Sequence, residues 1–125
     1  MRSSRVRDYH RLEIWRRAHA LAITIHDAAR GLRGSDFAAL RSQLTRAGDS
    51  VAANIVEGSG AESAREFARF LDMSIKSASE TEYHLLSARD RQSLPDHMWQ
   101  QLSGETVEIR RMTYAYRKRL LELQA

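Results

Sequence analysis

Three polar side chains with chemical potential, Ser50, Asn54 and Glu57, lie four and three residues apart in a run of small residues that ends at Gly60. In a helix this spacing places all three on one face. A hydroxyl, an amide and a carboxylate together could bind a small molecule or an ion.

A structural interpretation of the same residues competes with a ligand site, and we favour it. A buried Asn fixes the register of packed helices, so Asn54 could do so here. Glu57 would end its own helix and accept hydrogen bonds from backbone N–H groups, or from Arg65, at the start of the next helix. Gly58 and Gly60 would then form the turn of a helical hairpin that also contains Ser50.

Histidines and carboxylates are present, but their spacing does not predict a metal or catalytic site. His19 and His26 are seven residues apart, which is about 10 Å along a helix and too far for one ion without other ligands. Glu80 and Glu82 point to different faces of a helix, and the chain has no cysteine. No nucleophile elbow, phosphate loop or metalloprotease motif is recognisable. The sequence therefore favours a non-catalytic protein without a cofactor or metal.

Four amphipathic segments would carry these residues. Apolar or small residues recur at spacings of three and four, which is typical of helices in a bundle. Gly31 and Gly34 would end the first helix, which starts near His10. Ser35 or Asp36 would cap the second helix. The predicted inner positions are Ile14, Ala18, Leu21, Ile25, Ala28 and Leu32; Phe37, Leu40, Leu44, Ala47, Val51, Asn54 and Gly58; Phe67, Leu71, Ser74, Ala78, Thr81, Leu85 and Ala88; and Met98, Leu102, Thr106, Ile109, Met112, Tyr116 and Leu120.

The third and fourth helices have clear start signals. Ser63 and Glu66 have the spacing of a capping box, and Pro95 suits a helix start because its missing N–H costs nothing there. We expect an all-α, antiparallel up-down-up-down four-helix bundle, with residues 1–125 as a single domain and residues 1–9 as a basic arm. No apolar run is long enough to span a membrane, and no secretory signal is indicated. We therefore expect a cytoplasmic protein.

Positive charge is concentrated at the two ends of the chain. Residues 1–17 contain six arginines and two acids, and residues 110–125 contain five basic residues and one acid. An up-down-up-down bundle would bring both segments to the same end. There they could bind nucleic-acid phosphates, or form a solvated face with Arg–carboxylate pairs between subunits. The candidate phosphate contacts are Arg7, Arg11, Arg16, Arg17, Arg110, Arg111, Arg117, Lys118 and Arg119.

Three segments together resemble a known family: Leu12–Ala18, Ser50–Gly60, and Glu66–Leu71 followed by Ser77–Glu82. The sequence is similar to the bacterial four-helix-bundle proteins of 23S rRNA intervening sequences, which are related to the accessory variability proteins of diversity-generating retroelements. The resemblance implies a homopentameric ring. In the retroelement branch it also implies nucleic-acid binding through a basic surface, and a reverse transcriptase as a possible protein partner.

Two functions remain open from the sequence. The first is a non-catalytic, oligomeric protein that binds the backbone of RNA or an RNA–DNA hybrid, a choice of nucleic acid that rests on the resemblance alone. The second is an interaction module whose ring is a scaffold with no direct nucleic-acid role. In that case the contact residues would be Trp15, His19, Trp99 and Tyr114, because aromatic side chains are enriched at interfaces.

Overall fold

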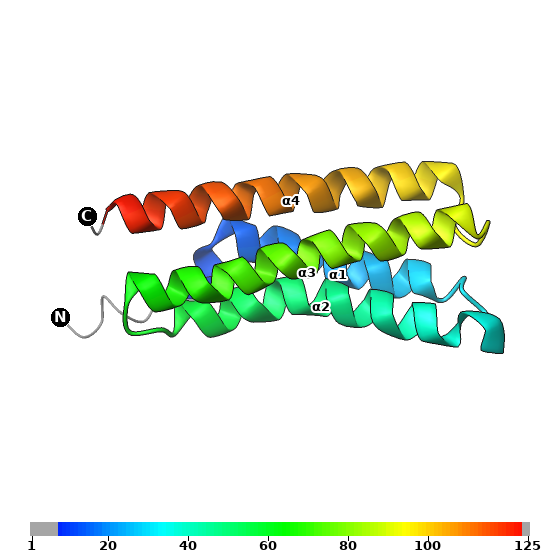
Figure 1. Cartoon of the computed structure of the whole chain (residues 1–125), viewed down its shortest axis with the longest axis horizontal. Helices are drawn as coiled ribbons and strands as arrows, with labels where there is room; N and C mark the ends of the chain where they lie inside the picture. Colours follow the sequence, from blue (N-terminus) through cyan, green and yellow to red (C-terminus); the bar gives the residue numbers. More distant parts are fainter. Residues whose placement is uncertain (1–7, 124–125) are drawn as a thin grey trace.

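The computed structural model describes residues 8–123, which form four α-helices and two short 3₁₀ turns. The helices are α1 (Glu13–Ala29), α2 (Ala38–Ser59), α3 (Ala64–Asp90) and α4 (Asp96–Glu122), and the turns are η2 (Tyr9–Arg11) and η3 (Ser35–Phe37). Successive helices run in opposite directions along a common axis (Figure 1), and residues 8–123 contain no strand. The predicted all-α antiparallel four-helix bundle is confirmed.

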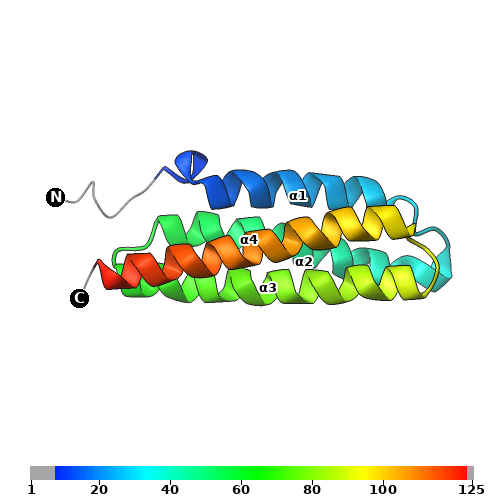
Figure 2. The same ribbon diagram turned by 90° about the horizontal axis from the view of Figure 1, so that it is seen from above.

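Each helix packs against two neighbours around the core. α2 and α4 both contact α1 and α3, whereas α1 and α3 lie on opposite corners of the bundle. From above, α1 lies along one edge and α3 along the other (Figure 2). Ile25 of α1, Phe67 and Leu85 of α3, and Ile109 of α4 are fully buried. None of the described helices is both long enough and apolar enough to cross a membrane.

The prediction of inner positions is most accurate in α3, where all seven predicted residues are buried. In α2 the prediction is wrong at Asn54, which is only partly buried, while the neighbouring Ile55 is fully buried. The reason is that α2 packs against both α1 and α3, so its buried surface is wider than one seam and includes Gly48 and Ala52. Thr113 of α4 is also buried and was not among the predicted inner residues.

The helix ends differ in part from the predictions. Ser63 is confirmed as the cap of α3, since its hydroxyl accepts a hydrogen bond from the Glu66 N–H. Pro95 directly precedes α4. The predicted cap of α2 by Ser35 or Asp36 is wrong, because both residues belong to η3 and α2 begins at Ala38 without a side-chain cap.

The first helix begins three residues later than predicted. The backbone of Leu12 is extended, with φ −84° and ψ 123°, and separates η2 from α1. Of the predicted basic arm, residues 1–7 lie outside the described range. Asp8 and Tyr9 are part of folded structure, because the Asp8 side chain caps η2 by accepting from the His10 N–H.

Candidate nucleic-acid interface

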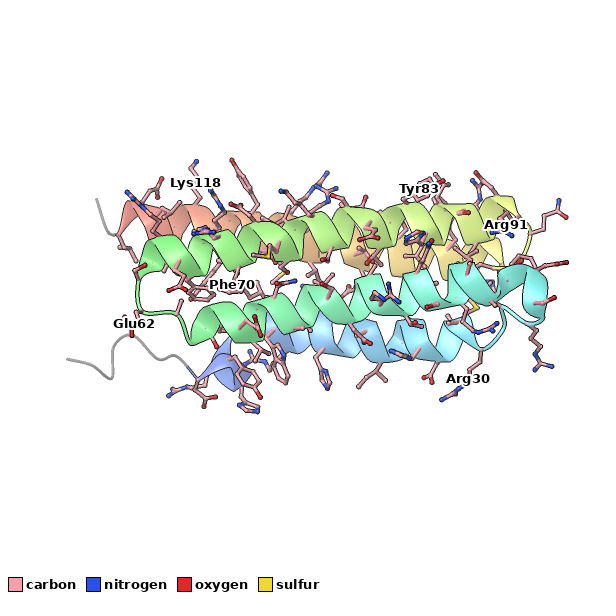
Figure 3. All side chains as sticks on the ribbon, turned by 60° about the horizontal axis from the view of Figure 1, so that its bottom comes forward. Arg30, Glu62, Phe70, Tyr83, Arg91 and Lys118 are labelled. Atoms are coloured by element: carbon pink, nitrogen blue, oxygen red, sulfur yellow. The ribbon has the colours of Figure 1, made fainter. Side chains whose placement is uncertain are left out.

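The start of α1, the loop between α2 and α3, and the end of α4 lie at the same end of the bundle (Figures 1 and 2). This is the arrangement that the up-down-up-down topology predicted. The basic residues of the two segments nevertheless point to more than one side of that end. Lys118 projects from α4 on the side opposite η2 and α1 (Figure 3). Arg119 of α4, in contrast, lines a hollow together with Leu12 and Glu13 at the start of α1.

Arg17 of α1 is engaged with two carboxylates of α4. Its Nη2 lies 2.9 Å from Oε1 of Glu105 and 2.9 Å from Oε1 of Glu108, and its Nε donates to Oε2 of Glu105 at 3.1 Å. These hydrogen bonds raise the pKa of Arg17 and lower that of Glu108. Arg17 therefore joins α1 to α4, and its fork of donors is occupied.

Arg110 and Arg117 of α4 are paired with α3. Arg110 Nε lies 2.6 Å from Glu82 Oε2, and Arg117 Nε lies 2.6 Å from Asp72 Oδ1. Both arginines are partly buried at the junction between the helices. The two ion pairs show the register of α3 against α4: residues 72–82 of α3 run opposite residues 110–117 of α4.

Apart from Arg7, the other residues predicted to contact phosphate are not held in ion pairs within residues 8–123, as Arg17, Arg110 and Arg117 are. Arg11, Arg111, Lys118 and Arg119 are exposed, and no ion pair joins any of them to residues within the described range. Arg16 is exposed and donates from Nη1 to the carbonyl oxygen of His10. Arg7 lies outside the described residues.

An exposed basic surface follows the outer side of α3 and α4 around Tyr114. Arg111, Tyr114 and Lys118 are spaced three and four residues apart on α4, and all three are exposed. Tyr114 is 57% exposed. Across the junction, α3 contributes the exposed cations Arg65, Arg69 and Lys76, which also share one face by their spacing. We call these six residues the α3–α4 basic face.

The chain is similar to known proteins both in sequence and in fold. The family model of the 23S rRNA-intervening sequence protein matches residues 10–115. The chain belongs to this family. Among solved structures, the fold is similar to a protein of unknown function of the S23 ribosomal protein family from Bacteroides thetaiotaomicron, with a TM-score of 0.79 and 24% identity over 84% of this chain and 98% of that one. No curated protein matches.

Within this family member, the hairpin residues have mainly packing roles. Asn54 donates to the backbone carbonyl and the hydroxyl of Ser50, and Ser50 also accepts a hydrogen bond from Ser77 of α3 at 3.0 Å. The interhelical contact thus comes from Ser50, and Asn54 supports it from the same helix. Glu57 is exposed and its carboxylate has no hydrogen bond or ion pair within residues 8–123, which differs from the predicted contact with α3.

The two glycines of the hairpin are not equivalent. A Cβ added to Gly58 would lie 2.6 Å from Cδ1 of Phe67 and 2.8 Å from Cβ of Phe70, so glycine is what allows α2 and α3 to approach closely here. At Gly60 the nearest atom would be a backbone oxygen 3.8 Å away, and its φ of −90° is accessible to other residues.

The four predicted interface aromatics have different surroundings. Trp15 and His19 stack on the outside of α1, with ring centroids 4.9 Å apart and planes 8° apart. Trp99 is half-buried under the guanidinium of Arg89, which lies 4.6 Å from the ring centroid. Trp99 also lines a hollow of about 390 Å³ with Tyr83 and Leu86, both exposed. Tyr114 belongs to the α3–α4 basic face.

Sequence reasoning missed the contribution of α3 to the candidate site. The spacing of Arg65, Arg69 and Lys76 is readable in the sequence, but only the ion pairs of Arg110 and Arg117 reveal that this row borders α4. Within the described residues, no group of three or more histidine and acidic side chains is arranged to hold a metal ion.

Proposed function

We propose that this family member is a non-catalytic, oligomeric protein that binds the backbone of RNA or an RNA–DNA hybrid through the α3–α4 basic face. The observation that supports this is the exposure of five cations around a solvent-exposed tyrosine. Lys and Arg side chains gain affinity for nucleic acid by releasing its condensed counterions. An exposed tyrosine can stack on a base that is unpaired.

The acids at the junction of this face do not cancel its charge. Asp72 and Glu82 are each neutralised by an arginine of α4, Arg117 and Arg110. Arg65, Arg69, Lys76, Arg111 and Lys118 have no carboxylate partner among residues 8–123. The exposed acids Glu80 and Glu122 follow Lys76 and Lys118 by one helical turn, so the cations of this face still outnumber these acids. Such a surface of exposed cations suits the phosphate backbone of a duplex, contacts to which carry no sequence information directly.

Assembly would strengthen binding through this face. Several copies in a ring, which the family resemblance implies as a pentamer, would repeat the α3–α4 basic face and raise the effective concentration of cations along one nucleic acid. A reverse transcriptase would fit as a protein partner of such a complex, and residence in the cytoplasm fits the absence of cysteine.

The proposal is tested by reversing charge on the α3–α4 basic face. In the Arg111→Glu, Lys118→Glu variant we expect at least tenfold weaker binding to duplex RNA and to an RNA–DNA hybrid. The dependence of log K on log salt should also become shallower by about two, at roughly one per lost phosphate contact. Both side chains are exposed, so the fold should persist, which circular dichroism can check.

A matched control changes net charge by the same amount elsewhere. Arg33 and Arg46 are exposed and lie outside the α3–α4 basic face. Binding by the Arg33→Glu, Arg46→Glu variant should fall only slightly, through the long-range field. Equal affinity of both double variants and the native protein for all probes would contradict the proposal.

A scaffold function is the second candidate, and one observation favours it. Tyr83 is 64% exposed and Leu86 38% exposed beside the Trp99 hollow, which is an apolar surface of the kind that protein partners cover. Sedimentation with and without RNA at two salt concentrations separates the two functions. An oligomer that forms without binding RNA would support the scaffold.

A further inference from the structure

A cluster of four aromatic rings covers the outer surface where α1 begins. This cluster is separate from the α3–α4 basic face. Tyr9 and His10 stack with centroids 4.1 Å apart, and each contacts the ring of Trp15 edge-on, at 4.9 Å and 5.3 Å. Trp15 in turn stacks on His19. We call these four residues the α1 ring cluster.

The ring cluster is held in place by polar contacts of the backbone that carries it. Asp8 caps η2 by accepting from the His10 N–H and also lies 2.8 Å from Nδ1 of the His10 ring. Arg16 donates to the His10 carbonyl from the first turn of α1. The rings are therefore preorganised before any ligand arrives, which lowers the entropic cost of binding.

The parallel pair Trp15–His19 is open to solvent at its His19 end. Trp15 is half-buried, whereas His19 is exposed and has no further ring stacked on it within the described chain. Ile23, one helical turn further along α1, is 52% exposed and extends the apolar surface. A flat π-system laid against His19 would continue the stack and bury this surface.

The charges beside the ring cluster favour an anionic ligand. Arg11 and Arg16 are exposed next to the rings. Of the two nearby acids, Asp8 is engaged by His10, and Glu13 is exposed without an ion pair to residues 8–123, so the cations outnumber the unpaired acid. Flat rings together with nearby cations are the combination by which proteins bind single-stranded nucleic acid.

We propose that the α1 ring cluster is a stacking site for unpaired nucleobases of single-stranded RNA or DNA, with Arg11 and Arg16 contacting the adjacent phosphates. This inference rests on the proposed function in assuming that nucleic acid is a ligand. It assigns a second site, on the side of the bundle away from Lys118, with a preference for single strands (Figure 3).

Trp15 provides a direct optical test, because stacking of a base quenches indole fluorescence. The full-length Trp99→Phe variant leaves Trp15 as the single tryptophan. We expect a short oligouridine to quench its emission with saturation, and an abasic oligomer with the same number of phosphates to bind at least tenfold more weakly. Introducing His19→Ala should weaken binding of the oligouridine about tenfold, which is within the range for loss of one stacking contact.

His26→Ala is the matched control for His19→Ala. His26 is also exposed on α1, but its Nε2 pairs with Asp49 outside the ring cluster. Its replacement should leave oligouridine binding unchanged. Equal quenching by the abasic oligomer, or equal effects of the two histidine variants, would overturn the proposal. The proposal would also be overturned if Trp15 emission shifted with protein concentration and did not respond to oligouridine, because a second copy of the chain would then cover the rings.

The two proposals can fail separately in these measurements. The Arg111→Glu, Lys118→Glu variant should lose duplex binding yet retain quenching by oligouridine. Duplex binding that depends on Arg111 and Lys118, without any quenching of Trp15, would refute the stacking site alone. Quenching that survives while the native protein fails to bind any duplex would refute the α3–α4 basic face alone.

Discussion

Replacing Gly58 by alanine tests whether close approach of α2 and α3 at this point limits the stability of the bundle. The added Cβ would lie 2.6 Å and 3.0 Å from two carbons of the Phe67 ring and 2.8 Å from Cβ of Phe70. Phe67 is fully buried and its ring packs edge-on against Tyr116, so a shift of its ring would disturb its neighbours. The Phe70 contact is to an atom fixed by the backbone of α3, so the helices must separate.

The expected magnitude is a difference between two opposing effects. Alanine is favoured over glycine inside a helix by about 1 kcal/mol. Overpacking a tight core costs about 1–3 kcal/mol, and two contacts below 3.0 Å place this site at the upper end. We therefore expect a net loss of about 1–2 kcal/mol in the free energy of unfolding. For a chain of this length that corresponds to a fall in Tm of about 4–8 °C.

Two other glycines supply matched controls for this measurement. At Gly104 of α4 an added Cβ would meet no atom within 4 Å, so Gly104→Ala should stabilise the protein by up to about 1 kcal/mol. At Gly48 the nearest atom is 3.1 Å away at the flexible end of Ile25, so Gly48→Ala should be close to neutral. Urea and thermal unfolding followed by circular dichroism, at one fixed protein concentration, would rank the three. Equal stability of the Gly58→Ala and Gly104→Ala variants would refute the reasoning.

Three further predictions concern polar contacts. Ser63→Ala should lower stability by about 1 kcal/mol in urea unfolding by removing the cap on the Glu66 N–H, whereas Ser63→Asp should largely preserve it. Ser74→Ala should also cost about 1 kcal/mol in the same assay, because the buried Ser74 hydroxyl donates to the Val51 carbonyl across the α2–α3 interface, and an unchanged urea midpoint would contradict this. Arg17 lowers the pKa of Glu108 below its usual value of 4.5. The ion pair therefore stabilises the fold above about pH 4.5, and this stabilisation is lost as the pH falls through the pKa that Glu108 has in the folded protein. In Arg17→Gln, stability measured from about pH 6 to pH 3 should fall less steeply than in the native protein, and parallel curves would contradict this.

Much of the fold could be predicted from the sequence because local patterns are sufficient for it. The seven inner positions of α3 follow strict spacings of three and four, and a helix can bury such a row in only one way. Ser63 could be identified as a cap because its partner, Glu66, is three residues away. The shared end of the bundle for both basic segments follows from the number of helices and short loops alone.

Errors arose where a residue has neighbours on two other helices. Asn54 continues the spacing of α2, yet Ile55 is the buried residue because α2 faces both α1 and α3. Glu57 was expected to contact α3, but the side chain of Ser63 caps that helix and leaves Glu57 exposed. The spacing of residues along one helix does not show whether that helix packs against one neighbouring helix or two.

In the candidate site, too, some properties follow from the sequence and others only from the packing of the helices. The sequence by itself determined that cations cluster at both chain ends, that four helices alternate in direction, and that no familiar catalytic motif is present. Only the tertiary structure decided which cations are available, since the carboxylates that engage Arg17, Arg110 and Arg117 come from helices far away in sequence. Charge is a property of each residue, whereas its exposure and pairing depend on which helix faces become neighbours, and that is fixed only when the bundle packs.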